Sequence, residues 1–108
     1  MLLCISADYT SDALIKLAQN PNDRQEAIGN LCEAAGAKLV TMYGRMTNGP
    51  GTMVVIDAPP LAGPAICAAI ATSGAFQNVR MERLFTMDEV SQIRQKRIEI
   101  SGAFRPGQ

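Results

Sequence analysis

The sequence predicts an α+β fold in which the order β-α-β-β-α-β forms one antiparallel sheet with helices on one face, followed by one more helix. Two runs, residues 2–5 and 53–56, are apolar at every position, which is typical of strands covered on both faces. Residues 47–51 have the composition of a tight turn, so the strands on either side are expected to form a hairpin. One helix layer covers only one face, and in a chain of 108 residues we expect a second copy to cover the other.

The first strand is predicted over residues 2–7, and two helical segments follow it. Thr10 or Ser11 can cap the first segment, and Pro21 suits the first turn of the second. Gly36 is expected to end the second segment. The residues expected to face inward are Leu14, Leu17 and Ala18 in the first segment, and Ala27, Leu31 and Ala34 or Ala35 in the second.

The second strand is predicted over residues 38–44 and the third over residues 52–57. Simple alternation in the second strand places Leu39, Thr41 and Tyr43 on one face and the residues between them on the other.

An alanine-rich helix is predicted from a start between residues 61 and 65 to Thr72, and a fourth strand over residues 76–85. Thr86 and Glu89 make a capping box for a terminal helix that runs to about Arg97. The fourth strand is expected to carry Val79, Met81 and Phe85 on one side and Arg80, Glu82 and Leu84 on the other. These elements together form a ferredoxin-like sandwich with an extra C-terminal helix.

Composition limits the classes of partner. The chain has 10 basic and 10 acidic residues and is 47% apolar, like an ordinary globular domain, so we predict neither a nucleic-acid nor a membrane partner. The longest apolar-rich run, residues 58–71, is too short to cross a bilayer and contains three prolines. Residues 1–7 lack the basic start and the length of a signal peptide, so a cytoplasmic location is expected.

Residue types also limit the chemistry. Histidine is absent, which removes the commonest general base and the commonest metal ligand. Cys4, Cys32 and Cys67 are odd in number, widely spaced and set among apolar residues, which favours small buried thiols over disulfides. No two cysteines have metal-ligand spacing, so we predict neither a metal site nor a cofactor. The glycines within residues 44–51 fit a hairpin better than a phosphate-binding loop, since no Lys-Ser or Lys-Thr follows them.

The C-terminal residues are expected to lie outside the domain. Residues 1–97 are predicted to form the domain and residues 98–108 a tail. Ile98, Ile100 and Phe104 would share one face of an extended segment. A terminus this apolar is not expected to stay exposed to water. We expect it to pack on a neighbouring subunit as an added edge strand.

Polar side chains on the predicted strands are the candidates for a ligand site, because a few polar groups in an apolar cavity are typical of small-molecule sites. Arg80 would supply a fixed positive charge for an anionic or carbonyl-bearing molecule, Tyr43 a hydrogen-bond donor, and Glu82 would orient Arg80 or move a proton. The alternative is a structural ion pair between Arg80 and Glu82. The candidate ligand-binding residues are Tyr9, Tyr43, Thr52, Arg80 and Glu82, with Ser6 beside them.

Several short motifs are weak signals of a protein family one by one, but their order and spacing along the chain are more specific. They are Tyr9-Thr10, Pro21 with Arg24 and Glu26-Ala27, residues 33–39, Tyr43, residues 54–59, Asn78-Val79-Arg80 and residues 85–89. In this arrangement the chain resembles the GYD-domain proteins over about residues 2–96. The resemblance implies a ferredoxin-like fold and an assembly of the dimeric α/β-barrel type, in which two sheets pack face to face.

One motif of that family is missing here. The Gly-Tyr-Asp tripeptide should fall just before the third strand, where this chain reads Asn48-Gly49-Pro50-Gly51-Thr52. If the family's ligand site uses the phenol and the carboxylate, this chain has lost that function or replaced those groups.

Three functions are consistent with these observations. The first is a homo-oligomeric small-molecule-binding or accessory protein with an apolar cleft beside the sheet. The second is a cofactor-independent isomerase, lyase or oxygenase of the dimeric α/β-barrel kind, in which Tyr43 or Glu82 transfers a proton. The third is a structural or regulatory assembly unit. A ligand in the cleft or a pH–rate profile would distinguish them.

Overall fold

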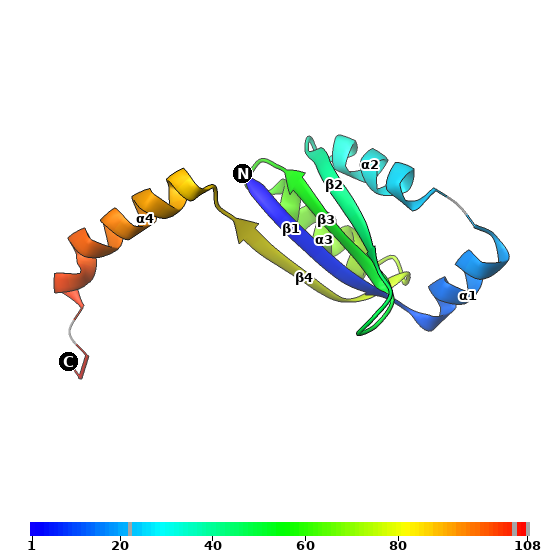
Figure 1. The fold of residues 1–108 in the computed structure, drawn as a ribbon. Coiled ribbons are helices and arrows are strands. Elements are labelled where there is room, and N and C mark those ends of the chain that lie inside the picture. The colour runs from blue at the N-terminus through cyan, green and yellow to red at the C-terminus, as the bar shows by residue number, and fades with distance from the viewer. Residues whose placement is uncertain (22, 105, 108) are drawn as a thin grey trace.

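The computed structural model of the chain describes residues 1–21, 23–104, 106 and 107. Four strands form one antiparallel sheet in the order β2-β3-β1-β4, and α3 lies behind this sheet in Figure 1. The arrangement confirms the predicted α+β, ferredoxin-like fold with a C-terminal helix. The elements are β1 (Leu2–Tyr9), α1 (Ser11–Gln19), α2 (Arg24–Ala34), β2 (Lys38–Arg45), β3 (Gly51–Asp57), α3 (Ala62–Ala71), β4 (Phe76–Leu84), α4 (Met87–Ile100) and the 3-10 turn η1 (Ser101–Ala103).

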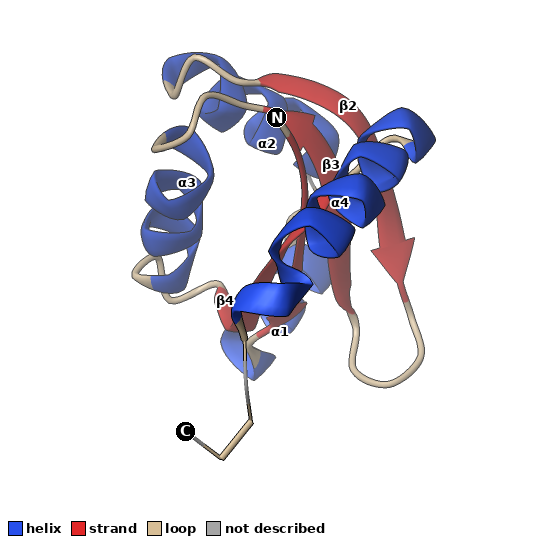
Figure 2. Ribbon diagram, turned by 90° about the vertical axis from the view of Figure 1, so that its left-hand side faces the viewer, coloured by secondary structure: helices blue, strands red, loops and turns tan. Residues whose placement is uncertain are grey.

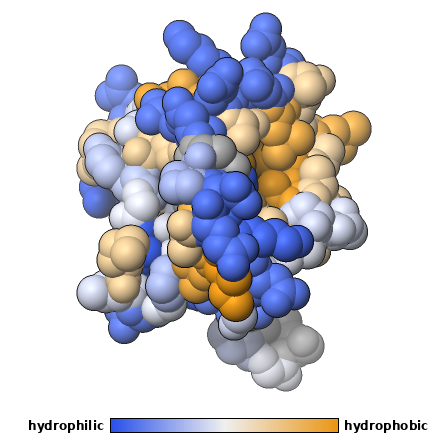
Figure 3. Space-filling view, turned by 90° about the vertical axis from the view of Figure 1, so that its right-hand side faces the viewer, coloured by the Kyte–Doolittle hydropathy of each residue, from blue (hydrophilic) through white to orange (hydrophobic). Residues whose placement is uncertain are grey.

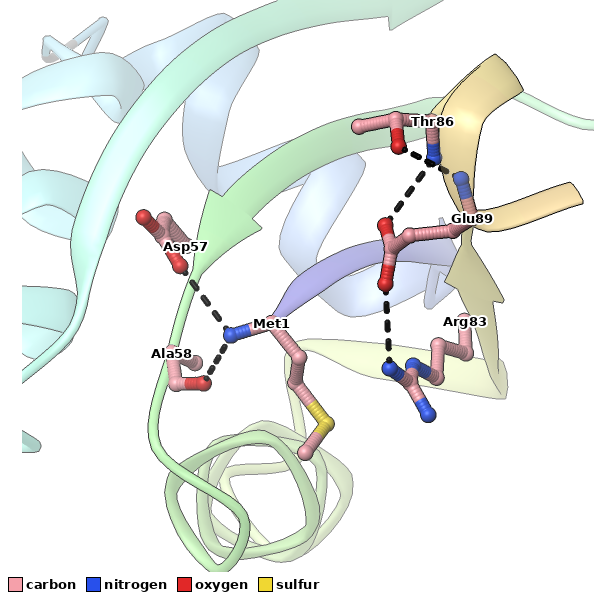
Figure 4. Close-up of polar contacts among 6 residues, drawn as sticks. All are labelled: Met1, Asp57, Ala58, Arg83, Thr86 and Glu89. Atoms are coloured by element: carbon pink, nitrogen blue, oxygen red, sulfur yellow. Dashed lines mark hydrogen bonds and ion pairs between the residues drawn. The ribbon is translucent and has the colours of Figure 1, made fainter. Parts of the chain in front are cut away.

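The predicted ends of several helices are confirmed. Of the two candidates, Thr10 caps α1, and its hydroxyl accepts the N–H of Ala13 at 3.2 Å. Thr86 and Glu89 form the capping box of α4, with reciprocal bonds of 3.1 and 3.0 Å (Figure 4). Gly36 follows the end of α2 with a φ of 75°, a conformation that strains residues with a side chain.

The core lies between one face of the sheet and helices α2 and α3. The inward residues predicted for the first two helices are partly wrong, because Ile28 and Cys32 are the buried residues of α2, whereas Ala27 and Ala34 are exposed. Ile28 and Cys32 lie one helical turn apart, and their larger side chains form the stripe that fills the space against the sheet. No residue of α1 is buried, since this helix lies beyond the end of the sheet (Figure 1). The main buried residues are Leu3, Ile5, Ala7, Ile28, Cys32, Val54, Ile56, Ala62, Ile66, Ile70 and Phe76.

A β-bulge in β2 decides which residues share a face. The pairing with β3 shifts between Leu39 and Thr41, so that Leu39 pairs with Ile56 and Thr41 pairs with Val55. Leu39 therefore packs against the core, whereas Thr41 and Tyr43 lie on the opposite face. The predicted alternation is wrong for Leu39, because the extra residue of a bulge leaves no mark on the hydrophobic pattern.

Helix α4 extends away from the sheet and the other helices (Figure 1), and in Figure 2, which looks from that end of the molecule, it lies in front of the sheet. None of its residues is buried, and the molecule measures 58 × 31 × 23 Å along its principal axes. The extended conformation predicted for Ile98 and Ile100 is wrong, because both residues lie in the last turn of α4. At about 100° per residue their side chains point in directions roughly 160° apart, so they do not share a face.

One acidic side chain links β4 to the start of α4. Glu89 Oε1 accepts the N–H of Thr86, and its Oε2 lies 3.5 Å from Nη2 of Arg83 (Figure 4). The Arg83 guanidinium also lies over the ring of Phe85, 4.6 Å from its centroid. The Glu89 carboxylate therefore both caps the helix and holds its first turn to the end of the strand.

Candidate functional site

The face of the sheet turned away from α2 and α3, here called the open face, lies toward the viewer in Figure 1. On this face β1 and β3 carry apolar residues at Leu2, Cys4, Met53 and Val55, and β1 carries polar residues toward its end. Three of the predicted site residues lie on the edge strands β2 and β4. The strand register assigns to the open face Leu2, Cys4, Ser6, Asp8, Thr41, Tyr43, Arg45, Met53, Val55, Arg80, Glu82 and Leu84.

Tyr43 and Arg80 lie in one row across the sheet. Tyr43 pairs with Met53, Met53 with Ser6, and Ser6 with Arg80. Three strand spacings of about 4.8 Å put the Tyr43 and Arg80 backbones roughly 14 Å apart. Both side chains are exposed, Tyr43 at 60%, so each is free to lean toward the centre of the face. A molecule that contacts both would lie across the two central strands.

Glu82 lies in the next row, directly opposite Cys4. Burial is the main cause that raises the pKa of the Cys4 thiol, and the negative charge of the Glu82 carboxylate raises it further. Cys4 therefore stays protonated at neutral pH and is a weak nucleophile. Arg80 and Glu82, both in the described part of the chain, form no ion pair with each other, so the purely structural pair considered above is not present.

Arg45, which the sequence pattern did not single out, is held on the open face by three groups. Its Nη1 donates to Ser6 Oγ at 2.8 Å, its Nε donates to the Gly49 carbonyl at 3.0 Å, and its Nη2 pairs with Asp8 Oδ1. Asn78 Nδ2 donates to the other oxygen of Asp8 at 2.9 Å. The Arg45 and Asp8 side chains are 26% and 14% exposed, so this cluster is partly desolvated. It connects β2, β1 and β4 across the sheet.

Gly51 makes this cluster possible. It pairs with Arg45 on one side and with Asp8 on the other, so the arginine has to cross it. A Cβ at this position would lie 2.1 Å from the Ala7 carbonyl oxygen and 2.8 Å from Arg45 Nη2. The opposite charges of Asp8 and Arg45 were the only signal in the sequence, and they become informative only once the strand order and register are known.

Two of the predicted site residues lie away from the open face. Thr52 is 7% exposed and lies on the core face, opposite Ala7, because it shares the alternation of the buried residues of β3. Tyr9 lies at the end of β1, where its ring stacks on Phe76 with centroids 5.1 Å apart. The expectation that all five candidates line one space is therefore wrong, and a role in ligand binding remains a prediction for each of them.

The other two cysteine thiols are also affected by burial. Burial raises the pKa of the Cys32 thiol. Burial is also the main cause of the raised pKa of the Cys67 thiol. Within residues 1–21, 23–104 and 106–107, no group of three or more His, Cys, Asp or Glu side chains could hold a metal ion. In the same part of the chain no helix has the length and apolar character needed to span a membrane.

The family model described as the GYD domain matches residues 4–93. The match runs from within β1 into α4 and includes every residue assigned to the open face except Leu2. No curated protein matches the chain. At the place where the resemblance puts the Gly-Tyr-Asp tripeptide, the chain forms the β2–β3 turn, in which Gly49 has a φ of 95° and receives the hydrogen bond from Arg45.

Proposed function

The chain belongs to the GYD-domain family, and from this premise we propose that two copies pack through their open faces and hold a small organic molecule between the sheets. The observation that carries the proposal is the uncovered apolar centre of the open face. Leu2, Cys4 and Val55 are partly exposed there, and Met53 is 40% exposed. Contiguous apolar surface on a soluble protein marks an interaction site, and sheet faces pack about 10 Å from one another.

The edge strands would supply the polar contacts to the ligand. Arg80 is an exposed cation that takes part in no ion pair within the described residues, so it is available to an anionic or carbonyl group. Tyr43 offers a hydroxyl, and Glu82 lies one row further along β4. Arg45 is not a ligand contact in this proposal, because Asp8 already neutralises its charge.

Sedimentation of the purified protein tests the assembly. We expect a dimer for the wild type and a monomer for Val55→Glu, because the new carboxylate would be buried between the two sheets. Ile15→Glu is the matched control, since Ile15 is an exposed residue of α1 away from the open face, and this variant should stay dimeric. A wild-type protein that stays monomeric at micromolar concentration would contradict the proposal.

Native mass spectrometry of the purified dimer tests the ligand. We expect a small non-covalent mass that is retained by the wild type and reduced in Arg80→Met, Tyr43→Phe and Glu82→Gln. Arg94→Met, on α4, is the control for loss of a positive charge. If these variants lower stability without changing the retained mass, the three residues have a structural role and the site assignment is wrong.

A further inference from the structure

A cavity lies at the α1 end of the molecule, away from the centre of the open face. It has a volume of about 280 Å³ and lies between α1, the start of α2 and the start of β4. Figure 3 views this end, with hydrophilic residues down the middle and hydrophobic residues gathered to the right, on the side of the helix layer. The residues that line the cavity are Tyr9, Ala13, Lys16, Leu17, Asn20, Arg24 and Ala75.

The walls of this cavity are anchored to the sheet. The backbone N–H of Thr10 donates to the Ala75 carbonyl at 3.0 Å, and the Thr10 hydroxyl donates to the Gly74 carbonyl at 2.8 Å. These bonds hold the beginning of α1 against the turn before β4. Tyr9 is held by its stack on Phe76, so both the aromatic wall and the helix have defined positions.

Two basic side chains of the cavity lack anionic partners. Lys16 and Arg24 take part in no ion pair among the residues that the structure describes. The Nε of Arg24 is buried and has no hydrogen-bond partner there, which is costly for a charged donor. The Arg24 guanidinium lies over the Phe76 ring, 5.8 Å from its centroid, which fixes its direction.

We propose that this cavity binds a small organic monoanion, a carboxylate attached to a compact apolar body. The carboxylate would lie between Lys16 and Arg24, with the amide of Asn20 as a further polar contact. The apolar body would lie against Leu17, Ala13 and Ala75, beside the Tyr9 ring. The volume is slightly below the usual range for drug-sized ligands, which favours a compact molecule.

Titration with benzoate, followed by amide chemical shifts in NMR, tests the proposal. We expect saturable shifts at the amides of Ala13, Lys16 and Leu17 and no comparable shifts along β2. Benzamide, which has the same body without the charge, and inorganic phosphate, which has charge without the body, should each bind at least about tenfold more weakly. Because the readout is assigned residue by residue, it does not depend on whether the open faces pair.

Variants assign the effect to the two cations. Lys16→Met and Arg24→Gln should each weaken benzoate binding about tenfold or more, whereas Lys96→Met, an exposed lysine on α4, should leave it unchanged. Lys16 is exposed, so its variant should fold normally even if Arg24→Gln does not. Absence of saturable shifts, shifts confined to the open face, equal binding of benzamide or of phosphate, or wild-type affinity in Lys16→Met would each overturn the proposal.

Discussion

Glu82 lies directly opposite Cys4 in the β1–β4 pairing, and its carboxylate is the second cause, after burial, of the raised pKa of the Cys4 thiol. The thiol thus serves as a reporter of the charge on the neighbouring strand. In Glu82→Gln the pKa of Cys4 should fall toward the ordinary value of 9.0 but stay above it, because the burial remains. At a fixed pH near 8 we expect iodoacetamide to alkylate Cys4 faster in this variant, as measured by mass spectrometry of the Cys4 peptide. Glu99→Gln on α4 should leave the rate unchanged, and an unchanged rate in Glu82→Gln would contradict this explanation of the shift.

The stability of the fold should decrease in alkaline solution. All three thiols have pKa values raised above 9.0 in the folded state, so the folded protein holds these protons more tightly than the unfolded chain. This stabilisation is fully present below about pH 9 and is lost as the pH rises through the raised values, by at most about 1.4 kcal/mol per pH unit for each thiol. In urea unfolding at a series of pH values above 9, the free energy of unfolding of Cys67→Ala should decrease less steeply with pH than that of the wild type. Ala68→Ser, on the same helix, should keep the wild-type dependence on pH.

Gly51→Ala should destabilise the protein more than the same change at a neighbouring glycine. The added Cβ would overlap the Ala7 carbonyl and push against the Arg45 guanidinium, so we expect a loss of about 1–3 kcal/mol in the free energy of unfolding. Gly44 is the matched control, because it also lies in the sheet and has open space around its Cβ position. Equal urea midpoints for the two variants would mean that the crossing of Arg45 over Gly51 does not require a glycine.

If the protein is a dimer as proposed, deleting residues 98–108 should weaken the dimer and leave the sheet domain folded. The deletion removes Ile98, Ile100 and Phe104, which are exposed in the single chain and which we expect to pack on a neighbouring subunit. Sedimentation at decreasing protein concentration should show dissociation at a higher concentration than for the wild type. An unchanged oligomeric state together with an unchanged melting temperature would count against a role of these residues in assembly.

The sequence predicted what local chemistry determines. The Thr10 cap, the Thr86–Glu89 capping box and the end of α2 before Gly36 depend on residues only a few positions apart. The order of helices and strands along the chain also followed, because the turn chemistry of each connection agrees with a ferredoxin-like fold. The placing of Arg80 and Glu82 together on one face also followed from alternation alone.

What the sequence could not predict depends on register and packing. The Arg45–Asp8 pair joins residues 37 positions apart on strands separated by β3, and nothing local signals it. Thr52 has the same polar character as Thr41, but register places the first on the core face and the second on the open face. Tyr9 was predicted as a ligand-binding residue, but its ring stacks on Phe76 of β4 and lines a cavity with residues of α1 and α2, whose positions follow from tertiary contacts.

The absence of buried residues in α4 means that this helix and the sheet domain do not unfold as one cooperative unit. An isolated helix of 14 residues is marginally stable in water, so its backbone amides should exchange with deuterium through local fraying, long before those of β1 and β3. If a second subunit covers α4, that exchange slows with rising protein concentration while exchange from the central strands stays constant. The helix farthest from the core is therefore the segment whose deuterium uptake reports most directly on association.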